Sequence, residues 1–130
     1  MRNEYATIGA AIANSSNPNM LFGVWSGGLG KPWKWAAEVG GNYWRTTTDI
    51  YNDWDSVLHN FDVTYSIPGI DRYTAPGHYT FLDQMVVGVV PNRSASIHGP
   101  GLTDVEMVSH LSMWVTCIVP LSSSDFAVFD

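Results

Sequence analysis

KPWKWAAEVGGNYWRTTTDI, residues 31–50, is the stretch that decides the fold class of this chain. Its first half, residues 33–39, predicts one or two helical turns, which Gly40 and Gly41 end because glycine commonly terminates helices. Its second half, residues 43–50, carries three consecutive threonines and predicts a β-strand, since β-branched side chains favour strands. The stretch therefore predicts a helical segment followed by a strand, a step that recurs in α/β folds.

Helices and strands alternate on both sides of this stretch. Apolar side chains at helical spacing and a predicted N-cap at Asn52 indicate a further helix, and Thr103 with Glu106 has the sequence of a capping box. The predicted helices cover residues 5–13, 53–61 and 103–117, and the predicted strands cover residues 20–25, 43–50, 79–82 and 118–121, with a second extended piece at 85–90. Strands that alternate with helices predict an α/β fold with a parallel sheet.

The composition of the 130-residue chain excludes several classes of protein. The chain is 45% hydrophobic and 14% charged, whereas disorder needs low hydrophobicity and high charge. Its net charge of −6 argues against a nucleic-acid partner, and no apolar run approaches the roughly 18 residues that span a bilayer. One cysteine, Cys117, excludes an internal disulfide. Small domains normally cover their surface with charge, so this low charge indicates that the chain is part of something larger.

Two carboxylates and one arginine are the candidate residues for chemistry. Asp49 ends the threonine-rich strand and Asp83 follows the next predicted strand, where the functional residues of α/β folds collect. Each aspartate has an alternative interpretation as a cap or turn residue. Arg45 lies four residues before Asp49, on the same side of an extended strand, and burying it requires a carboxylate or a ligand. The alternative for Arg45 is a solvated position at a sheet edge.

Six tryptophans are the second unusual feature. Trp25 ends a predicted strand, and the others are Trp33, Trp35, Trp44, Trp54 and Trp114. An aromatic surface formed by Trp25 and the three that follow it would suit a sugar, whose C–H groups stack on rings while its hydroxyls bind polar groups. Core packing is the alternative for Trp25, and it is the preferred interpretation of Trp54 and Trp114, which lie at helical spacing.

The four histidines lack the paired spacing of metal ligands, so the sequence predicts no metal site. His110 lies in the middle of a predicted helix and is interpreted as a buried or boundary histidine. The glycines do not form a phosphate-binding or dinucleotide-binding motif.

Three motifs resemble glycoside hydrolase family 27, which holds the α-galactosidases and α-N-acetylgalactosaminidases. Residues 31–50 are similar to the family pattern PW-x-WA…VG-N-x-WR-x-x-x-DI, with one extra glycine. Residues 75–88, APGHYTFLDQMVVG, are similar to GPGGWNDPDMLxxG. Residues 101–114, GLTDVEMVSHLSMW, followed by Pro120 and Leu121, are similar to GLT-x-x-E…HF-x-x-W…APL. The motifs occur in the family order along most of the chain.

This resemblance implies a partial (β/α)8 barrel comprising approximately the fifth to eighth strands. The full-length relative would hydrolyse terminal α-galactosides with retention and without a metal or cofactor. Residues 1–130 would then be part of one catalytic domain, with no second domain. In the family, the aspartate matching Asp49 is the general acid/base, and the arginine matching Arg45 contacts the sugar and an active-site carboxylate. The aspartate matching Asp83 belongs to the pocket after the seventh strand, and the tryptophan matching Trp25 lies beside the substrate-recognition loop. The expected substrate-binding residues are therefore Trp25, Arg45 and Asp83.

The sequence also departs from the family pattern. The family's nucleophile is an aspartate on the fourth strand, whereas the acids that precede Asp49 here are Glu4 and Glu38. Since a retaining glycosidase needs two carboxyl groups, we expect the 130 residues alone to be inactive and to need the missing half of the barrel or another protein partner. The alternative is a non-catalytic half-barrel that serves as a structural or carbohydrate-binding subunit of a larger assembly.

A further departure lies in the family's Cys-x-Trp motif, which reads Gly23, Val24 and Trp25 here. The resemblance implies a secreted or lysosomal/vacuolar protein, although residues 5–13 are predicted to be an ordinary helix rather than a signal peptide. Two N-glycosylation sequons, at Asn14 and Asn92, would matter only in a secreted protein.

Overall fold

The computed structural model describes residues 1–91 and 98–117. Its elements, in chain order, are α1 (Arg2–Ala13), β1 (Gly23–Val24), the 3-10 helices η1 (Pro32–Lys34) and η2 (Ala37–Val39), β2 (Tyr43–Arg45), α2 (Trp54–Tyr65), η3 (Ile70–Tyr73), β3 (Tyr79–Phe81) and α3 (Asp104–Thr116). The predicted helical segments are confirmed, with shifted bounds. The predicted strand at residues 118–121 and the sequon at Asn92 lie outside the described residues.

The strands form one parallel sheet in the order β1-β2-β3, as the alternation of helices and strands predicts. Gly23 of β1 pairs with Tyr43 of β2, and Tyr43 pairs with Tyr79 of β3. Helical segments connect neighbouring strands, because parallel strands need a crossover connection. Each of these strands is shorter than predicted, and the predicted extended piece at residues 85–90 is not a strand.

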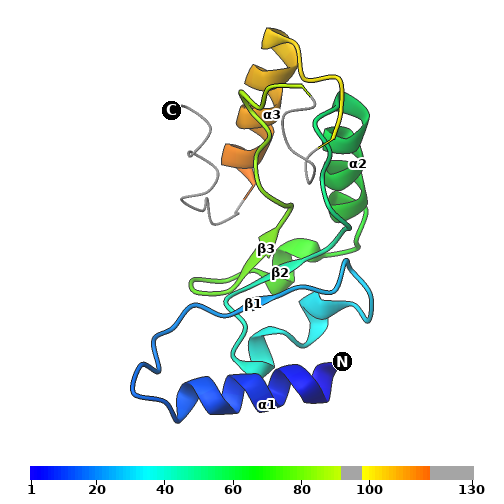
Figure 1. Ribbon diagram of the computed structural model, residues 1–130. Helices are drawn as coiled ribbons and strands as arrows, with labels where there is room; N and C mark the ends of the chain where they lie inside the picture. The colour runs from blue at the N-terminus through cyan, green and yellow to red at the C-terminus, as the bar shows by residue number, and fades with distance from the viewer. Residues whose placement is uncertain (92–97, 118–130) are drawn as a thin grey trace.

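One face of the sheet packs against the amino-terminal helices. Successive side chains of a strand point to opposite faces, and one face buries a cluster of Phe22, Val24, Trp35, Ala36 and Trp44. Tyr5 and Ile12 of α1 pack against this cluster. Figure 1 shows α1 lying along the β1 side of the sheet.

Aromatic rings and Arg45 share the opposite face. The ring of Tyr43 lies over Gly23, where a Cβ atom would be 2.4 Å from the ring. Tyr43 also packs edge-on against Phe81, with 5.4 Å between ring centroids, and the Arg45 guanidinium lies 6.0 Å from the centroid of Phe81. The absence of a side chain at Gly23 therefore gives Tyr43 its space on this face.

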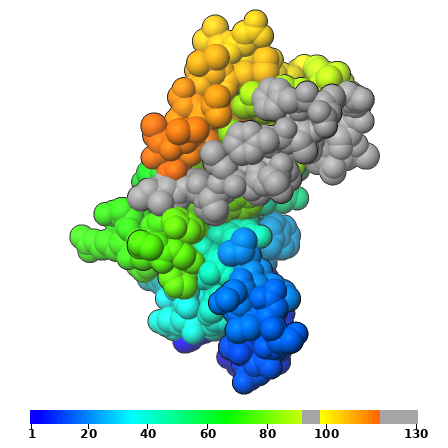
Figure 2. Space-filling model, turned by 90° about the vertical axis from the view of Figure 1, so that its left-hand side faces the viewer, coloured from blue at the N-terminus to red at the C-terminus, as the bar shows by residue number. Residues whose placement is uncertain are grey.

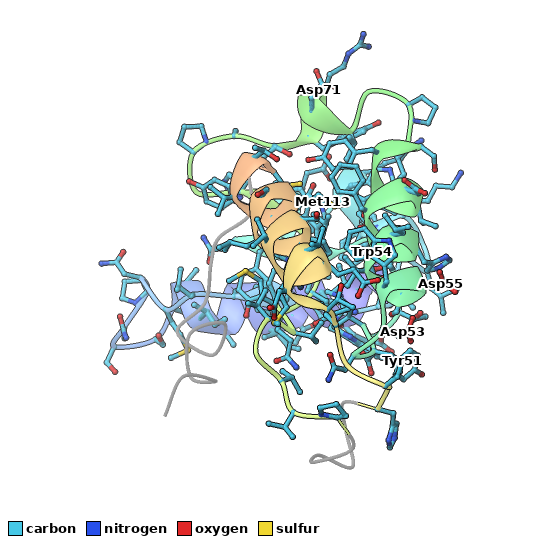
Figure 3. All side chains as sticks on the ribbon, turned by 90° about the horizontal axis from the view of Figure 1, so that it is seen from above. Tyr51, Asp53, Trp54, Asp55, Asp71 and Met113 are labelled. Carbon is cyan, nitrogen blue, oxygen red and sulfur yellow. The ribbon has the colours of Figure 1, made fainter. Side chains whose placement is uncertain are left out.

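A second buried cluster joins the segments that follow β2 and β3 to α2 and α3. It contains Ile50, Val57, Leu82, Met85, Val86, Trp114 and Cys117. In Figure 3, Trp54 at the start of α2 turns toward α3 and Met113, whereas Asp55 points away. The molecule is elongated, with α1 at one end and α3 at the other (Figure 2). No helix in residues 1–91 or 98–117 has the length and apolar character needed to cross a bilayer.

The helix caps explain where α2 and α3 begin. The predicted N-cap of α2, Asn52, is wrong by one residue: the side chain of Asp53 accepts the hydrogen bond from the first turn. Asn52 is buried, and its side-chain amide donates to the carbonyl of Val89 at 2.9 Å. At α3, Thr103 and Glu106 form the predicted capping box.

Asn42 joins the three strands at their amino ends. Its Oδ1 accepts from the backbone N–H of Phe22 at 2.8 Å, and its Nδ2 donates to the carbonyl of Gly77 at 3.1 Å. Its own N–H donates to the carbonyl of Phe22 at 2.7 Å, and its carbonyl accepts from the N–H of Tyr79 at 2.8 Å. One side chain thus fixes the chain segments that lead into β1 and β3.

Candidate functional site

The carboxyl ends of the strands carry the candidate residues. Trp25 directly follows β1, Arg45 is the last residue of β2, Asp49 comes after it, and Asp83 follows β3. Since the strands are parallel, these ends meet at the same edge of the sheet, where α/β proteins place their ligands. The structure brings Arg45, Asp49 and Asp83 together as one ion-paired group, which we call the Arg45 cluster.

Arg45 is the centre of this cluster, and 5% of the residue is exposed. Its Nη2 lies 2.6 Å from Oδ2 of Asp83, and its Nη1 lies 3.5 Å from Oδ1 of Asp49. Nη2 also donates to the carbonyl of Thr48. Burial lowers the pKa of the Arg45 guanidinium, and the two carboxylates oppose that shift. The alternative of a solvated edge position is therefore wrong, because carboxylates accompany a guanidinium that is removed from water.

Asp83 is the buried carboxylate of the cluster. Besides the ion pair, its Oδ2 accepts from the N–H of Ile50 at 2.8 Å, and its Oδ1 accepts from the N–H of Gln84 at 2.8 Å. Burial raises the pKa of the Asp83 carboxyl, while the charge of Arg45 and the two N–H groups oppose that shift. Asp83 therefore ties the end of β3 to the segment that follows β2.

Asp49 is the exposed carboxylate, with 66% of its side chain accessible. The segment that leads to it, residues 46–49, is not part of the strand. The hydroxyl of Thr46 lies 2.6 Å from the hydroxyl of Thr64 on α2, and a Cβ on Gly28 would be 2.2 Å from the carbonyl oxygen of Thr46. Close packing thus fixes the backbone before Asp49, while its carboxylate stays open to solvent beside a buried cation.

Trp25 presents an exposed ring at the same edge of the sheet, with 58% of the residue accessible. The hydroxyl of Tyr5 donates to its carbonyl and holds α1 against the end of β1. Within the described residues, core packing does not account for this tryptophan. An exposed aromatic ring at this end of the sheet is suited to stacking on the C–H face of a sugar.

The other tryptophans are mainly structural. Trp35 and Trp44 were expected in the aromatic surface, but they are buried in the amino-terminal cluster, because they lie on the helix-covered face of the sheet. Trp33 is half-buried against the same cluster. The preferred interpretation of Trp54 and Trp114 as core residues is confirmed, since Trp114 is fully buried and Trp54 packs on the second cluster.

His110 is buried in α3, as its position in a predicted helix indicated. His110 accepts the N–H of Val86 at Nε2, at 3.0 Å, and its ring packs edge-on against Trp114 with 4.1 Å between centroids. Among residues 1–91 and 98–117, no group of three or more His, Cys, Asp or Glu side chains could hold a metal ion.

Sequence reasoning missed the backbone groups that complete the Arg45 cluster. The carbonyl of Thr48 and the N–H groups of Ile50 and Gln84 have no signal in a sequence, because any residue carries them. Gly28 did have a signal, since adjacent glycines indicate a turn, but that turn's contact with Thr46 depends on tertiary structure.

Charged side chains gathered where parallel strands end are typical of the ligand sites of α/β proteins, and this chain has that architecture. No protein-family model matches the chain. Alpha-galactosidase A of Cellvibrio japonicus is 34% identical over 129 residues, a match that covers 92% of this chain and 28% of that protein. The alpha-galactosidase of Cyamopsis tetragonoloba is 31% identical over 121 residues, covering 93% of this chain and 26% of that protein.

Solved structures give the same result. A candidate α-galactosidase/melibiase from Bacteroides fragilis superimposes with a TM-score of 0.83 and 27% sequence identity, covering 92% of this chain and 26% of that one. The resemblance to the α-galactosidases, a family of glycosidases, is therefore confirmed. The chain spans about a quarter of the length of these relatives.

Proposed function

We propose that this chain is part of the catalytic barrel of a retaining α-galactosidase. In this proposal β1, β2 and β3 are the fifth, sixth and seventh barrel strands, and residues 1–130 belong to one catalytic domain of a secreted or lysosomal/vacuolar enzyme. The similarity to α-galactosidases over 92% of the chain supports the substrate class. The position of the Arg45 cluster at the carboxyl ends of the strands supports the location of the site.

Asp49 is the proposed general acid/base, and one observation carries this role: its exposed carboxylate lies 3.5 Å from a buried guanidinium. As a carboxylic acid, Asp49 donates its proton to the glycosidic oxygen while the bond to the anomeric carbon breaks. As a carboxylate, it then accepts a proton from the water that hydrolyses the glycosyl-enzyme. Arg45 orients Asp49 and contacts the sugar, and Trp25 stacks on the sugar ring.

The nucleophile of the proposed reaction comes from outside the described residues. Retention needs a second carboxylate about 5–5.5 Å from the acid/base. Asp83 is the carboxylate that shares Arg45 with Asp49, but both of its oxygens already accept hydrogen bonds and it is 8% exposed. It is therefore poorly placed to attack a sugar.

The rest of the barrel is the proposed partner of this chain. Within the described residues, β1 pairs with β2 along one edge and leaves its other edge free. Large apolar side chains close to this strand in the sequence are exposed, among them Leu21 at 77% and Leu29 at 69%. A further strand on the free edge of β1 would cover them, as closure of a barrel requires.

A non-catalytic, carbohydrate-binding subunit is the second candidate function. The observation that favours it is the exposed ring of Trp25, which can hold a sugar without any chemistry. The two functions differ in what Asp49 does, because binding needs a hydrogen-bond acceptor whereas catalysis needs a proton donor.

Leaving-group dependence tests the catalytic role of Asp49. In the complete protein that contains this chain, we expect Asp49→Asn to slow hydrolysis of an α-galactosyl disaccharide by about 10²–10⁴-fold, the range of general acid catalysis. An activated nitrophenyl α-galactoside should be slowed much less, because its leaving oxygen hardly needs a proton. Asp55→Asn, an exposed change on α2, is the matched control and should leave both rates unchanged.

Equal losses on the two substrates would reject Asp49 as the acid. If the unaltered complete protein does not hydrolyse either substrate but binds galactose in a calorimetric titration, the carbohydrate-binding function replaces the enzymatic one.

A further inference from the structure

The carboxylate of Asp83 receives hydrogen bonds from three separate parts of the molecule. Arg45 reaches it from the end of β2, Ile50 from the position after Asp49, and Gln84 from the segment after β3. These donors belong to the protein itself and occupy both oxygens. Such a carboxylate is already satisfied before any substrate arrives.

Arg45 connects this buried carboxylate to the exposed one. Its Nη2 lies 2.6 Å from Asp83, and its Nη1 lies 3.5 Å from Asp49. The exposed fractions of the two aspartate side chains differ sharply, at 11% and 66%. Asp83 thus holds the guanidinium from the buried side, and Asp49 meets it from the solvent side.

Asp83 also acts on the backbone next to Asp49. The N–H that it accepts at 2.8 Å belongs to Ile50, the residue that directly follows Asp49. Arg45 in turn donates to the carbonyl of Thr48, the residue that directly precedes Asp49. The two residues together therefore hold the chain on both sides of the proposed acid/base.

The core holds Asp83 itself in place. Its φ angle is 91°, in the left-handed region that disfavours a residue with a side chain, so surrounding contacts must impose this conformation. One such contact is visible, since Nε1 of the fully buried Trp114 donates to the carbonyl of Asp83 at 2.8 Å. α3 thus sets the position of Asp83.

We infer that Asp83 is a positioning residue, which fixes Arg45 and the backbone around Asp49 rather than contacting the sugar. This inference rests on the proposed function and changes the role expected for Asp83 from the family resemblance. It predicts that Asp83 acts on catalysis through Arg45.

A double-mutant cycle in the complete protein tests this inference. With an α-galactosyl disaccharide, whose leaving oxygen needs the proton of Asp49, we expect Asp83→Asn to lower kcat about tenfold or more while KM changes about twofold or less, because an interaction that positions the acid/base does not bind ground-state substrate. In an Arg45→Met background, Asp83→Asn should lower kcat/KM by about twofold at most, because the guanidinium is gone and the amide oxygen of asparagine can still accept the N–H of Ile50. A rise in KM at constant kcat, or losses that multiply in the double variant, would overturn the inference.

The unaltered protein provides a readout that needs neither activity nor a folded variant. A guanidinium held by Asp83 should rotate slowly, so that its Nη protons give separate NMR signals at neutral pH, whereas those of the exposed Arg72 should average. Averaged Nη signals for Arg45 would overturn the inference. If the complete protein hydrolyses no α-galactoside, the proposed function fails, and this measurement still decides whether Asp83 holds Arg45.

Discussion

His110 makes the stability of this protein depend on pH, and its contribution can be separated from that of the carboxylates. The side chain is fully buried in α3, and its Nε2 must stay unprotonated to accept the N–H of Val86. The other ring nitrogen, Nδ1, has no hydrogen-bond partner among the residues that the structure describes. Burial accordingly lowers the pKa of His110 from 6.5 to about 4.

The direction of the effect follows from this shift. Above about pH 6.5 the imidazole is neutral in both the folded and the unfolded chain, and the pair with Val86 is intact. As the pH falls from 6.5 toward 4, His110 binds a proton in the unfolded chain but stays neutral in the folded chain, so the free energy of unfolding decreases. A shift of two to three units at about 1.4 kcal/mol per unit gives a loss of about 3 kcal/mol.

Urea denaturation across this pH range measures the loss, and His110→Gln separates it from the titration of the carboxylates. Glutamine can accept the same N–H without titrating, so the variant should lose about 3 kcal/mol less than the unaltered chain between pH 6.5 and 4. His59→Gln, which removes an exposed histidine of α2, should keep the full dependence. Parallel stability curves for the unaltered chain and His110→Gln would refute the reasoning.

Two further substitutions test how the sheet and the site are held. Gly28→Ala should destabilise the protein by roughly 1–3 kcal/mol in thermal denaturation, because φ is +80° and the new Cβ would lie 2.2 Å from the carbonyl oxygen of Thr46; an unchanged melting temperature would contradict this contact. Asn42→Ala removes the side-chain hydrogen bonds to Phe22 and Gly77 and should cost about 1–3 kcal/mol in urea denaturation, with faster amide exchange at Phe22; unchanged protection of that amide would show that another group replaces Asn42.

Local patterns predicted the types and order of the elements because their causes are local. The capping box at Thr103 and Glu106 lies within one turn of α3, and both partners are visible in the sequence. Strand length is different, since the three threonines after Arg45 favour a strand but leave the sheet. Arg45 binds the carbonyl of Thr48 instead, and Thr46 contacts Thr64 of α2, so these contacts override β-propensity there.

In the candidate site, too, local relations could be predicted from the sequence and long-range contacts could not. The spacing of Arg45 and Asp49 predicted that their side chains lie on the same side of a strand. The two groups do meet, with 3.5 Å between Nη1 of Arg45 and Oδ1 of Asp49. The predicted reason was wrong, because the chain between them is not an extended strand. The contact of Asp83 with this site could not be derived from sequence spacing, since its carboxylate bonds Ile50, which lies 33 positions earlier in the chain. Its backbone carbonyl in turn accepts from Trp114, on a helix still further along the chain.

The contact between Tyr43 and Gly23 has a consequence for how relatives of this protein evolve. A Cβ at position 23 would lie 2.4 Å from the tyrosine ring, so the two positions share one volume that a single side chain can fill. Restoring the cysteine of the family's Cys-x-Trp motif at Gly23 therefore requires the Tyr43 ring to move away or a smaller residue to replace it. Either change made first should be deleterious and the second compensatory, so substitutions at these neighbouring strands should appear as a correlated pair across lineages.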